Sequence, residues 1–89
     1  PVSLDVSQTG VLLPDSTRVD CLTDTYVIEI EWAYSWKEAI GQALYYALMT
    51  NKKPGIALVY KKPVDVKYLK QLNAVLIANR LDIRVWVIE

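Results

Sequence analysis

The chain has no histidine, only one cysteine and no long apolar run. Each of these features excludes a class of site or a class of protein. Structural zinc sites take their ligands from cysteine and histidine, so a site of this kind is nearly excluded. Cys21 has no partner for an internal disulfide, and we expect a buried free thiol in a reducing, cytoplasmic compartment. A membrane helix needs about 20 consecutive apolar residues. Since the signal-peptide pattern is also missing, the sequence predicts no membrane partner.

The formal net charge of the chain is zero, because ten basic residues balance ten acidic ones. The two halves nevertheless differ, since residues 1–44 carry seven acids and two bases, whereas residues 45–89 carry three acids and eight bases. An acidic cluster that holds a cation beside a basic surface is typical of nucleic-acid enzymes. The alternative is a chance division of charge over solvated faces. The neutral total argues against strong non-specific DNA binding by a monomer.

The N-terminal half shows the pattern of a three-strand meander. With 89 residues, 53% of them hydrophobic, we expect one folded domain spanning residues 1–89. Residues 11–13 and 18–23 predict a hairpin, because the intervening Pro-Asp-Ser favours a turn. Residues 25–32, rich in β-branched and aromatic side chains, predict the third strand. Residues 1–9 fit an edge strand or an arm.

The clearest helix pattern spans residues 35–50. Ser35 and Glu38 fit a capping box, in which each side chain accepts a backbone N–H at the helix start. The turn residues of 51–55 then end the helix. Apolar residues at three- and four-residue spacing predict a buried stripe made of Ala39, Ile40, Ala43, Leu44, Ala47 and Leu48.

The rest of the chain continues the alternation of strands and helices. Residues 56–60 form a short apolar run, which is typical of a strand buried on both faces. Residues 64–79 predict a second helix, and residues 83–88 a last strand. The helix directs one set of side chains inward: Tyr68, Leu69, Leu72, Val75 and Leu76. This order predicts an α/β fold, in which helices flank a mixed sheet with a parallel part.

Three acidic residues occupy two neighbouring predicted strands. Asp20 lies on the second strand, and Glu29 and Glu31 lie two apart on the third, where they share a face. If the strands pair, the three carboxylates converge and raise one another's pKa unless a cation neutralises them. Magnesium prefers one or two carboxylates and keeps several waters. The pattern therefore predicts a Mg²⁺ or Mn²⁺ site.

Further polar side chains are placed to act on a phosphodiester at such a site. A bound metal would polarise the phosphoryl oxygen and acidify an attacking water. Lys37, in the first turn of the following helix, would orient that water or stabilise the developing charge. Gln42 and Tyr46 lie four apart on one helix face and suit phosphate or water binding. Arg18 fits a phosphate contact or a carboxylate pair. Each residue taken alone also fits a bland role: a solvent-facing position, or a core position for Tyr46.

The combination resembles the PD-(D/E)xK nuclease superfamily, which has the restriction-endonuclease-like fold. Asp20 and Glu29 match the two acids of its motif, and the Gln42-to-Tyr46 segment resembles the Q-x-x-x-Y motif of its RecB-like branch. The resemblance extends from about Val11 to Val87. Glu31 stands where the motif has lysine, and a migrated lysine would then be Lys37. The N-terminal helix of the family has no clear counterpart in residues 1–10.

The resemblance implies a Mg²⁺-dependent nuclease that hydrolyses DNA and forms a homodimer, as small nucleases of this fold commonly do. Two alternatives stay open: a catalytically inactive nuclease-fold module that binds nucleic acid or protein, and a small α/β interaction domain. In the nuclease, the metal would be held by Asp20, Glu29 and the Ile30 carbonyl. Catalysis would depend on Asp20, Glu29, Glu31 and Lys37, and substrate binding on Gln42, Tyr46 and Arg18.

Overall fold

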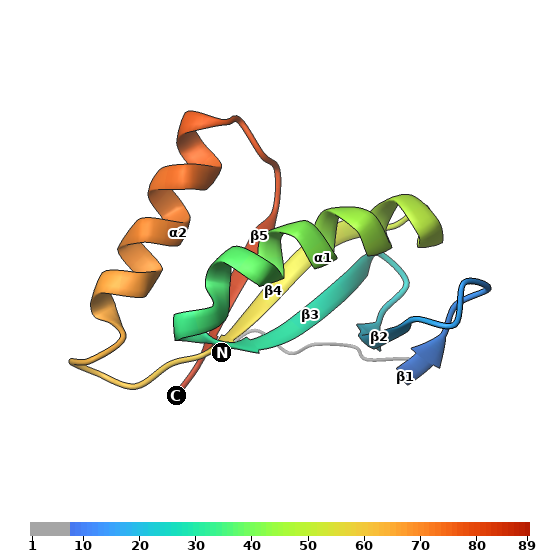
Figure 1. Ribbon diagram of the computed structural model, residues 1–89, viewed down its shortest axis with the longest axis horizontal. Helices are drawn as coiled ribbons and strands as arrows, with labels where there is room; N and C mark the ends of the chain where they lie inside the picture. The colour runs from blue at the N-terminus through green and yellow to red at the C-terminus, as the bar shows by residue number, and fades with distance from the viewer. Residues whose placement is uncertain (1–7) are drawn as a thin grey trace.

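The structure, a computed structural model, describes residues 8–89 (Figure 1). The predicted N-terminal arm therefore lies largely outside the described residues. No helix within residues 8–89 is long and apolar enough to span a membrane. The elements follow the order β1 (Gln8–Leu12), β2 (Arg18–Leu22), β3 (Tyr26–Trp32), a 3₁₀ turn (Ala33–Ser35), α1 (Trp36–Thr50), β4 (Lys53–Val59), α2 (Val66–Ala78) and β5 (Arg84–Ile88).

The strands form one five-stranded mixed sheet in the order β1-β2-β3-β4-β5. The first three strands pair antiparallel, as the predicted meander requires. The pairs β3–β4 and β4–β5 are parallel. Parallel neighbours need a crossover connection, and α1 and α2 supply the two crossovers. The predicted α/β class with a mixed sheet is therefore confirmed.

Both helices pack against the same face of the sheet. Trp36, Ala39 and Ala43 of α1 and Leu72 and Leu76 of α2 share one buried cluster, which also contains Ile56 and Leu58 of β4. In Figure 1, α1 crosses in front of β3 and β4. A smaller cluster of Cys21, Ile28 and Ala57, joined by Tyr26 and Trp86, is separate from that core. Cys21 is a buried free thiol, as predicted, and burial raises its pKa.

The start and the outer face of α1 differ from the sequence-based prediction. Ser35 caps the helix without a side-chain hydrogen bond, so the predicted capping box is wrong. A 3₁₀ turn precedes the helix and already directs the chain into it. Leu44 and Leu48 are 38% and 78% exposed, so they do not belong to the buried stripe. Because Trp36 sets the rotation of the helix on the sheet, the buried side runs along the small side chains of Ala39 and Ala43, and these leucines turn outward.

Strand β4 begins at Lys53, inside the segment that was predicted to be a turn. Pro54 pairs with Val27 of β3, whereas the ladder with β5 starts one residue later, between Gly55 and Arg84. Proline is tolerated in a strand where no ladder hydrogen bond is required of its missing N–H. Pro54 therefore occupies the part of β4 that has a strand partner on one side.

Gly55 allows an aromatic ring to lie directly on the sheet. A Cβ atom built at Gly55 would be 2.6 Å from Trp86 Cζ3 and 3.4 Å from Ile28 Cγ1. The Trp86 ring is held from another side by an edge-on contact with Tyr26, with ring centroids 5.3 Å apart. The lack of a side chain at Gly55 is therefore required for the packing between β3, β4 and β5.

We predict that Gly55→Ala destabilises the protein by about 1–3 kcal/mol, because a rigid ring must move to admit the methyl group. Gly41→Ala is the matched control, since a Cβ there meets nothing within 4 Å. In a helix, alanine is favoured over glycine by about 1 kcal/mol, so the control is expected to be neutral or stabilised. Urea unfolding of the three proteins measures both effects. Equal stability of Gly55→Ala and wild type would contradict the close packing.

Candidate functional site

The structure brings Asp20 of β2 and Glu29 of β3 together. The two strands pair antiparallel through Cys21–Ile28 and Leu22–Val27. Continued by one residue, this register places Asp20 beside Glu29. Asp20 Oδ2 accepts the backbone N–H of Ile30 at 2.9 Å, so a side chain holds this N–H of β3. A hydrogen bond also joins the carboxyl groups of Asp20 and Glu29. The two acids that the sequence singled out therefore form one carboxyl pair.

Glu29 is the buried member of the pair, with 4% of its surface exposed. Burial raises its pKa to about 8, and the charges of Asp20 and Glu31 and the hydrogen bond with Asp20 act in the same direction. A buried carboxylate without a countercharge is costly, so the group holds a proton at neutral pH. Its Oε1 atom is buried and has no hydrogen-bond partner among the described residues. Buried polar atoms in proteins normally have a hydrogen-bond partner. The Glu29 Oε1 atom has none among the described residues, so it can still accept a ligand.

Tyr46 of α1 lies beside the carboxyl pair. Its ring packs against the cluster of Leu13, Val19, Leu22 and Val27. Burial raises the pKa of Tyr46 most, followed by the charge of Glu29, whereas a hydrogen bond with Thr17 lowers it. The role of this tyrosine in substrate binding stays a prediction.

The turn between β1 and β2 adds polar groups that the sequence interpretation missed. Asp15 accepts hydrogen bonds from the Thr17 hydroxyl at 2.6 Å and from the Tyr45 hydroxyl. These bonds lower the pKa of Asp15, first through Thr17 and then through Tyr45, and the bond with Asp15 raises the pKa of Tyr45. The Pro-Asp-Ser sequence predicts a turn and nothing more. The hydrogen bond between Asp15 and Tyr45 depends on contact between this turn and α1, which only the tertiary structure shows.

Glu31 does not complete a three-carboxylate cluster. Its Oε1 accepts the N–H of Trp32 at 3.3 Å, and it affects Glu29 through its charge. Within residues 8–89, no group of three or more acidic, cysteine or histidine side chains is arranged to hold a metal. The expected convergence of three acids is therefore reduced to a pair, because Glu31 bonds locally near the end of β3.

Of the other predicted site residues, Ile30 contacts the pair through its backbone N–H, and Lys37 and Arg18 make contacts elsewhere. Lys37 is exposed, with its Nζ atom 5.7 Å from the centroid of the Trp36 ring. Gln42 is exposed on α1. Arg18 Nη1 donates to the carbonyl of Gly10 at 3.0 Å, across the hairpin. Ile30 contributes its N–H to Asp20, and the metal role of its carbonyl stays a prediction.

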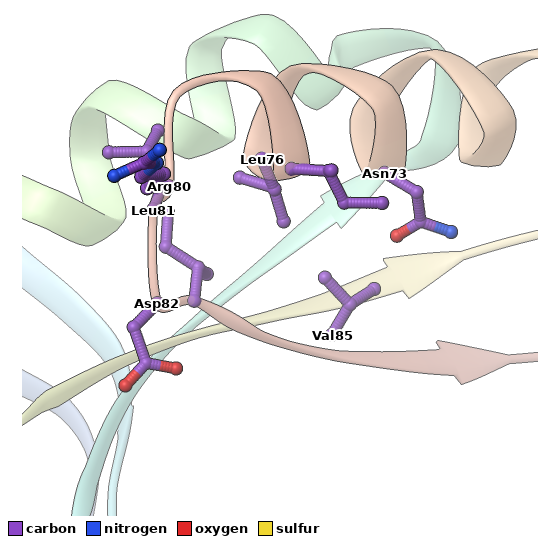
Figure 2. A pocket seen from close by; sticks show the side chains of 8 residues that line it. Asn73, Leu76, Arg80, Leu81, Asp82 and Val85 are labelled. Atoms are coloured by element: carbon purple, nitrogen blue, oxygen red, sulfur yellow. The ribbon is translucent and has the colours of Figure 1, made fainter.

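A cavity lies away from the carboxyl pair, between the end of α2 and the start of β5. Its volume is about 660 Å³, and Figure 2 shows Asn73 and Leu76 on the helix opposite Val85 on the strand. Arg80 and Asp82 lie on the connecting loop at one end. The carboxyl pair is on β2 and β3, so this cavity belongs to a different part of the sheet.

Comparisons with known proteins give one partial match. A KilA-N domain-containing protein of Acanthamoeba polyphaga mimivirus is 35% identical over 60 residues. The aligned segment is 67% of this chain and spans 16% of the viral protein's length. No family model matches the sequence, and no solved structure matches it.

The raised pKa of Glu29 predicts a pH dependence of stability. Below pH 4.5 the group is protonated in both states, and between pH 4.5 and about 8 only the unfolded chain ionises, so the free energy of unfolding falls as pH rises. We expect Glu29→Gln, which is neutral and keeps the shape, to remove this fall and to stabilise the protein at pH 8–9. At roughly 1.4 kcal/mol per pKa unit the gain is a few kcal/mol at most.

Urea titrations at pH 4, 6 and 9 would measure this effect. Glu31→Gln is the control, because it removes a nearby charge and leaves the buried group in place. It is expected to lessen the pH dependence slightly. Parallel stability curves for wild type and Glu29→Gln would show that Glu29 ionises normally.

Proposed function

We propose that this chain is a nuclease domain that hydrolyses DNA with Mg²⁺ or Mn²⁺ and has a restriction-endonuclease-like fold. The observation that carries the proposal is the pair formed by Asp20 and Glu29, which come from adjacent strands and share a hydrogen bond. The buried Glu29 oxygen without a partner adds to it. Because Glu29 holds a proton at neutral pH beside Asp20, the pair is well suited to exchange that proton for a cation.

The topology supports the same proposal. The resemblance implies a core of a helix, a three-strand meander, a helix and a further strand. The run from β1 to β4 has the order of the meander, helix and further strand, whereas α2 and β5 follow it. Asp20 lies on the second strand of the meander and Glu29 on the third, where the motif has its two acids. The fold alone permits many functions, so the carboxyl pair rather than the topology decides the proposal.

The residues present fit a magnesium or manganese ion. Asp20 and Glu29 offer hard carboxylate oxygens, and magnesium in proteins commonly uses one or two carboxylates and water. When bound, such an ion polarises a phosphoryl oxygen and lowers the pKa of a water. The Ile30 carbonyl is the proposed additional ligand.

The protein's own contribution is to orient these groups. The hydrogen bond from the Ile30 N–H fixes the Asp20 carboxylate on β3, and supporting bonds of this kind orient ligand side chains. Tyr46 packs against the apolar cluster that contains Val27 and is close enough for the charges of Glu29 and Asp20 to raise its pKa. We place Lys37, with Glu31, among the groups that support the attacking water, and Gln42 and Arg18 among those that contact the DNA backbone.

A catalytically inactive nuclease-fold module is the second candidate. It is favoured by the contact of Lys37 with Trp36 and by the acid at the position where the motif has lysine. The match to the viral protein covers 16% of that protein, so it does not decide between a nuclease and a binding module. A homodimer stays a prediction.

Cleavage assays distinguish the two candidates. We expect the wild type to cleave DNA with Mg²⁺ or Mn²⁺, and Asp20→Asn and Glu29→Gln each to lower the rate by a factor of at least about 100, the scale of losing one electrostatic group. Asparagine keeps an acceptor for the Ile30 N–H, so the fold is expected to survive. Circular dichroism verifies folding, and Asp82→Asn, in the remote cavity, is the control. Metal binding by calorimetry without cleavage would favour the inactive module, and neither binding nor cleavage would reject the metal site.

Lys37→Ala tests whether the lysine of the motif has moved to α1. We expect turnover to fall about 10- to 100-fold while metal affinity changes little, because the side chain would act on the water and not on the ion. Lys70→Ala removes an exposed lysine from α2 and is the control. Unchanged turnover in Lys37→Ala would exclude this lysine from the mechanism.

A further inference from the structure

Within residues 8–89, β5 has a strand partner on one side only. It is the last strand of the sheet and pairs with β4. The carbonyl of Ile88 accepts the Tyr60 N–H at 2.8 Å, so the main-chain groups of Ile88 point toward β4. These groups alternate in direction along a strand. Val85 and Val87 therefore direct their N–H and C=O groups outward, where no strand of the described chain pairs with them.

The edge of β5 lacks the features that commonly prevent pairing with another chain. Edge strands are normally protected by prolines, charges or bulges. Between Arg84 and Glu89, β5 contains only β-branched and aromatic side chains. The opposite edge of the sheet differs, because Gly10 interrupts β1 with a φ of 58° and its carbonyl accepts Arg18 Nη1 at 3.0 Å. Of the two edges, β5 is therefore the one to which a further strand can be added.

The cavity between α2 and β5 lies on the helix side of the same edge. Figure 2 shows Val85 of the strand opposite Asn73 and Leu76 of the helix. Ile77 of α2 also lines this cavity, although its side chain is 77% exposed. An element that pairs with the edge of β5 would therefore cover apolar side chains of α2 as well.

We infer that β5 pairs antiparallel with β5 of a second copy of this chain, about a two-fold axis. Such pairing is self-complementary, as an interface between identical surfaces requires. The strands overlap over their whole length when Trp86 lies opposite Trp86 of the second copy. In this register Val85 pairs with Val87 of the second copy, so the outward main-chain groups face each other. The two sheets then form one continuous sheet.

The side chains of β5 are compatible with this approach. The Trp86 ring lies over Gly55 of β4 and meets Tyr26 edge-on, so it is directed into the sheet and not across the free edge. Val85 packs against the core beneath the helices, and Val87, two residues on, shares its face. Val87 of the second copy would lie opposite Val85 and enter the cavity that Val85 lines.

Charge complementarity favours a second copy as the occupant. Glu89 shares the helix-side face with Val87, and in the same register it lies opposite Ile83 of the second copy. Ile83 and Arg80 line the same cavity. Figure 2 shows Arg80 on the helix side of the connecting loop, whereas the carboxylate of Asp82 points away from the helix. The Glu89 carboxylate of one copy would therefore meet Arg80 of the other, twice about the axis.

Sedimentation velocity of the 89-residue chain over a range of concentrations measures this self-association. We expect a monomer–dimer equilibrium that Val87→Pro weakens by at least about 10-fold, because proline removes one outward N–H from each copy. The Val87 N–H does not bond to β4, so the pairing of β4 with β5 is expected to survive.

Ile77→Lys tests the part of the interface that α2 contributes. A charge in the covered cavity is expected to weaken the dimer by at least about 10-fold, since its burial lacks a partner. Leu48→Lys is the matched control, because Leu48 on α1 is 78% exposed, close to the 77% of Ile77. It is expected to leave the dimer unchanged.

A charge exchange tests the register. Arg80→Glu is expected to weaken the dimer roughly 5-fold, the scale of a surface charge pair. The double variant Arg80→Glu with Glu89→Arg is expected to restore the affinity, because the charges then oppose each other again across the axis. Glu89 also borders Lys61 within its own chain, so Lys61→Ala is the control and is expected to have no effect.

Amide hydrogen exchange locates the interface independently. The N–H groups of Val85 and Val87 are expected to exchange more slowly as the protein concentration rises, whereas those of Trp86 and Ile88 face β4 and exchange slowly at every concentration. Circular dichroism verifies folding of each variant. If Val87→Pro does not fold, Ile77→Lys and the exchange of the wild type decide the question.

Several outcomes would overturn the interface. These are a chain that stays monomeric up to millimolar concentration, a dimer that Ile77→Lys and Leu48→Lys affect equally, or a dimer in which exchange of the Val85 and Val87 amides is independent of concentration. The nuclease proposal does not enter these measurements, since it is judged by metal-dependent cleavage in Asp20→Asn and Glu29→Gln, so either can fail alone.

Discussion

The Asp20 carboxylate holds two strands together at the point where the candidate site forms. It accepts the Ile30 N–H of β3 and shares a hydrogen bond with the Glu29 carboxyl group. The same side chain therefore completes the sheet and fixes the second acid. Because Glu29 is buried with one unpartnered oxygen, the arrangement leaves an unsatisfied polar atom where a cation would be most effective. Glu29 is buried, whereas Asp20 is half-buried, and Tyr46 of α1 feels the charges of both.

The carboxyl pair lowers the stability that a neutral side chain at position 29 would give. A neutral side chain in place of Glu29 would avoid both desolvation and repulsion from Asp20 and Glu31. Strained or unsatisfied groups of this kind are concentrated at functional sites. Further along β3, Glu31 bonds to Trp32, whose exposed ring stacks on Tyr34. Glu29 and Trp32 thus belong to the same strand, three residues apart, and their side chains point to opposite faces of the sheet.

Much of the fold could be predicted from the sequence, because local patterns determine it. Turn chemistry and β-branched residues identified the hairpin and β3, and the alternation of strands and helices identified the parallel part of the sheet. The errors came where several patterns compete. The rotation of α1 is set by Trp36 packing on the sheet, which exposes Leu44 and Leu48 against their helical periodicity. Likewise Pro54 is part of β4, because its neighbouring strand β5 starts one residue later.

For the site, the sequence by itself determined that Asp20 and Glu29 lie on consecutive strands and that Tyr46 follows on the next helix. Strand alternation and helical spacing are properties of the chain alone. Only the tertiary structure decided that Glu31 stays outside the pair, that Thr17 bonds to Tyr46, and that Lys37 rests against Trp36. These outcomes depend on how far each side chain lies from solvent and from partners distant in sequence, and burial of this kind is settled by packing.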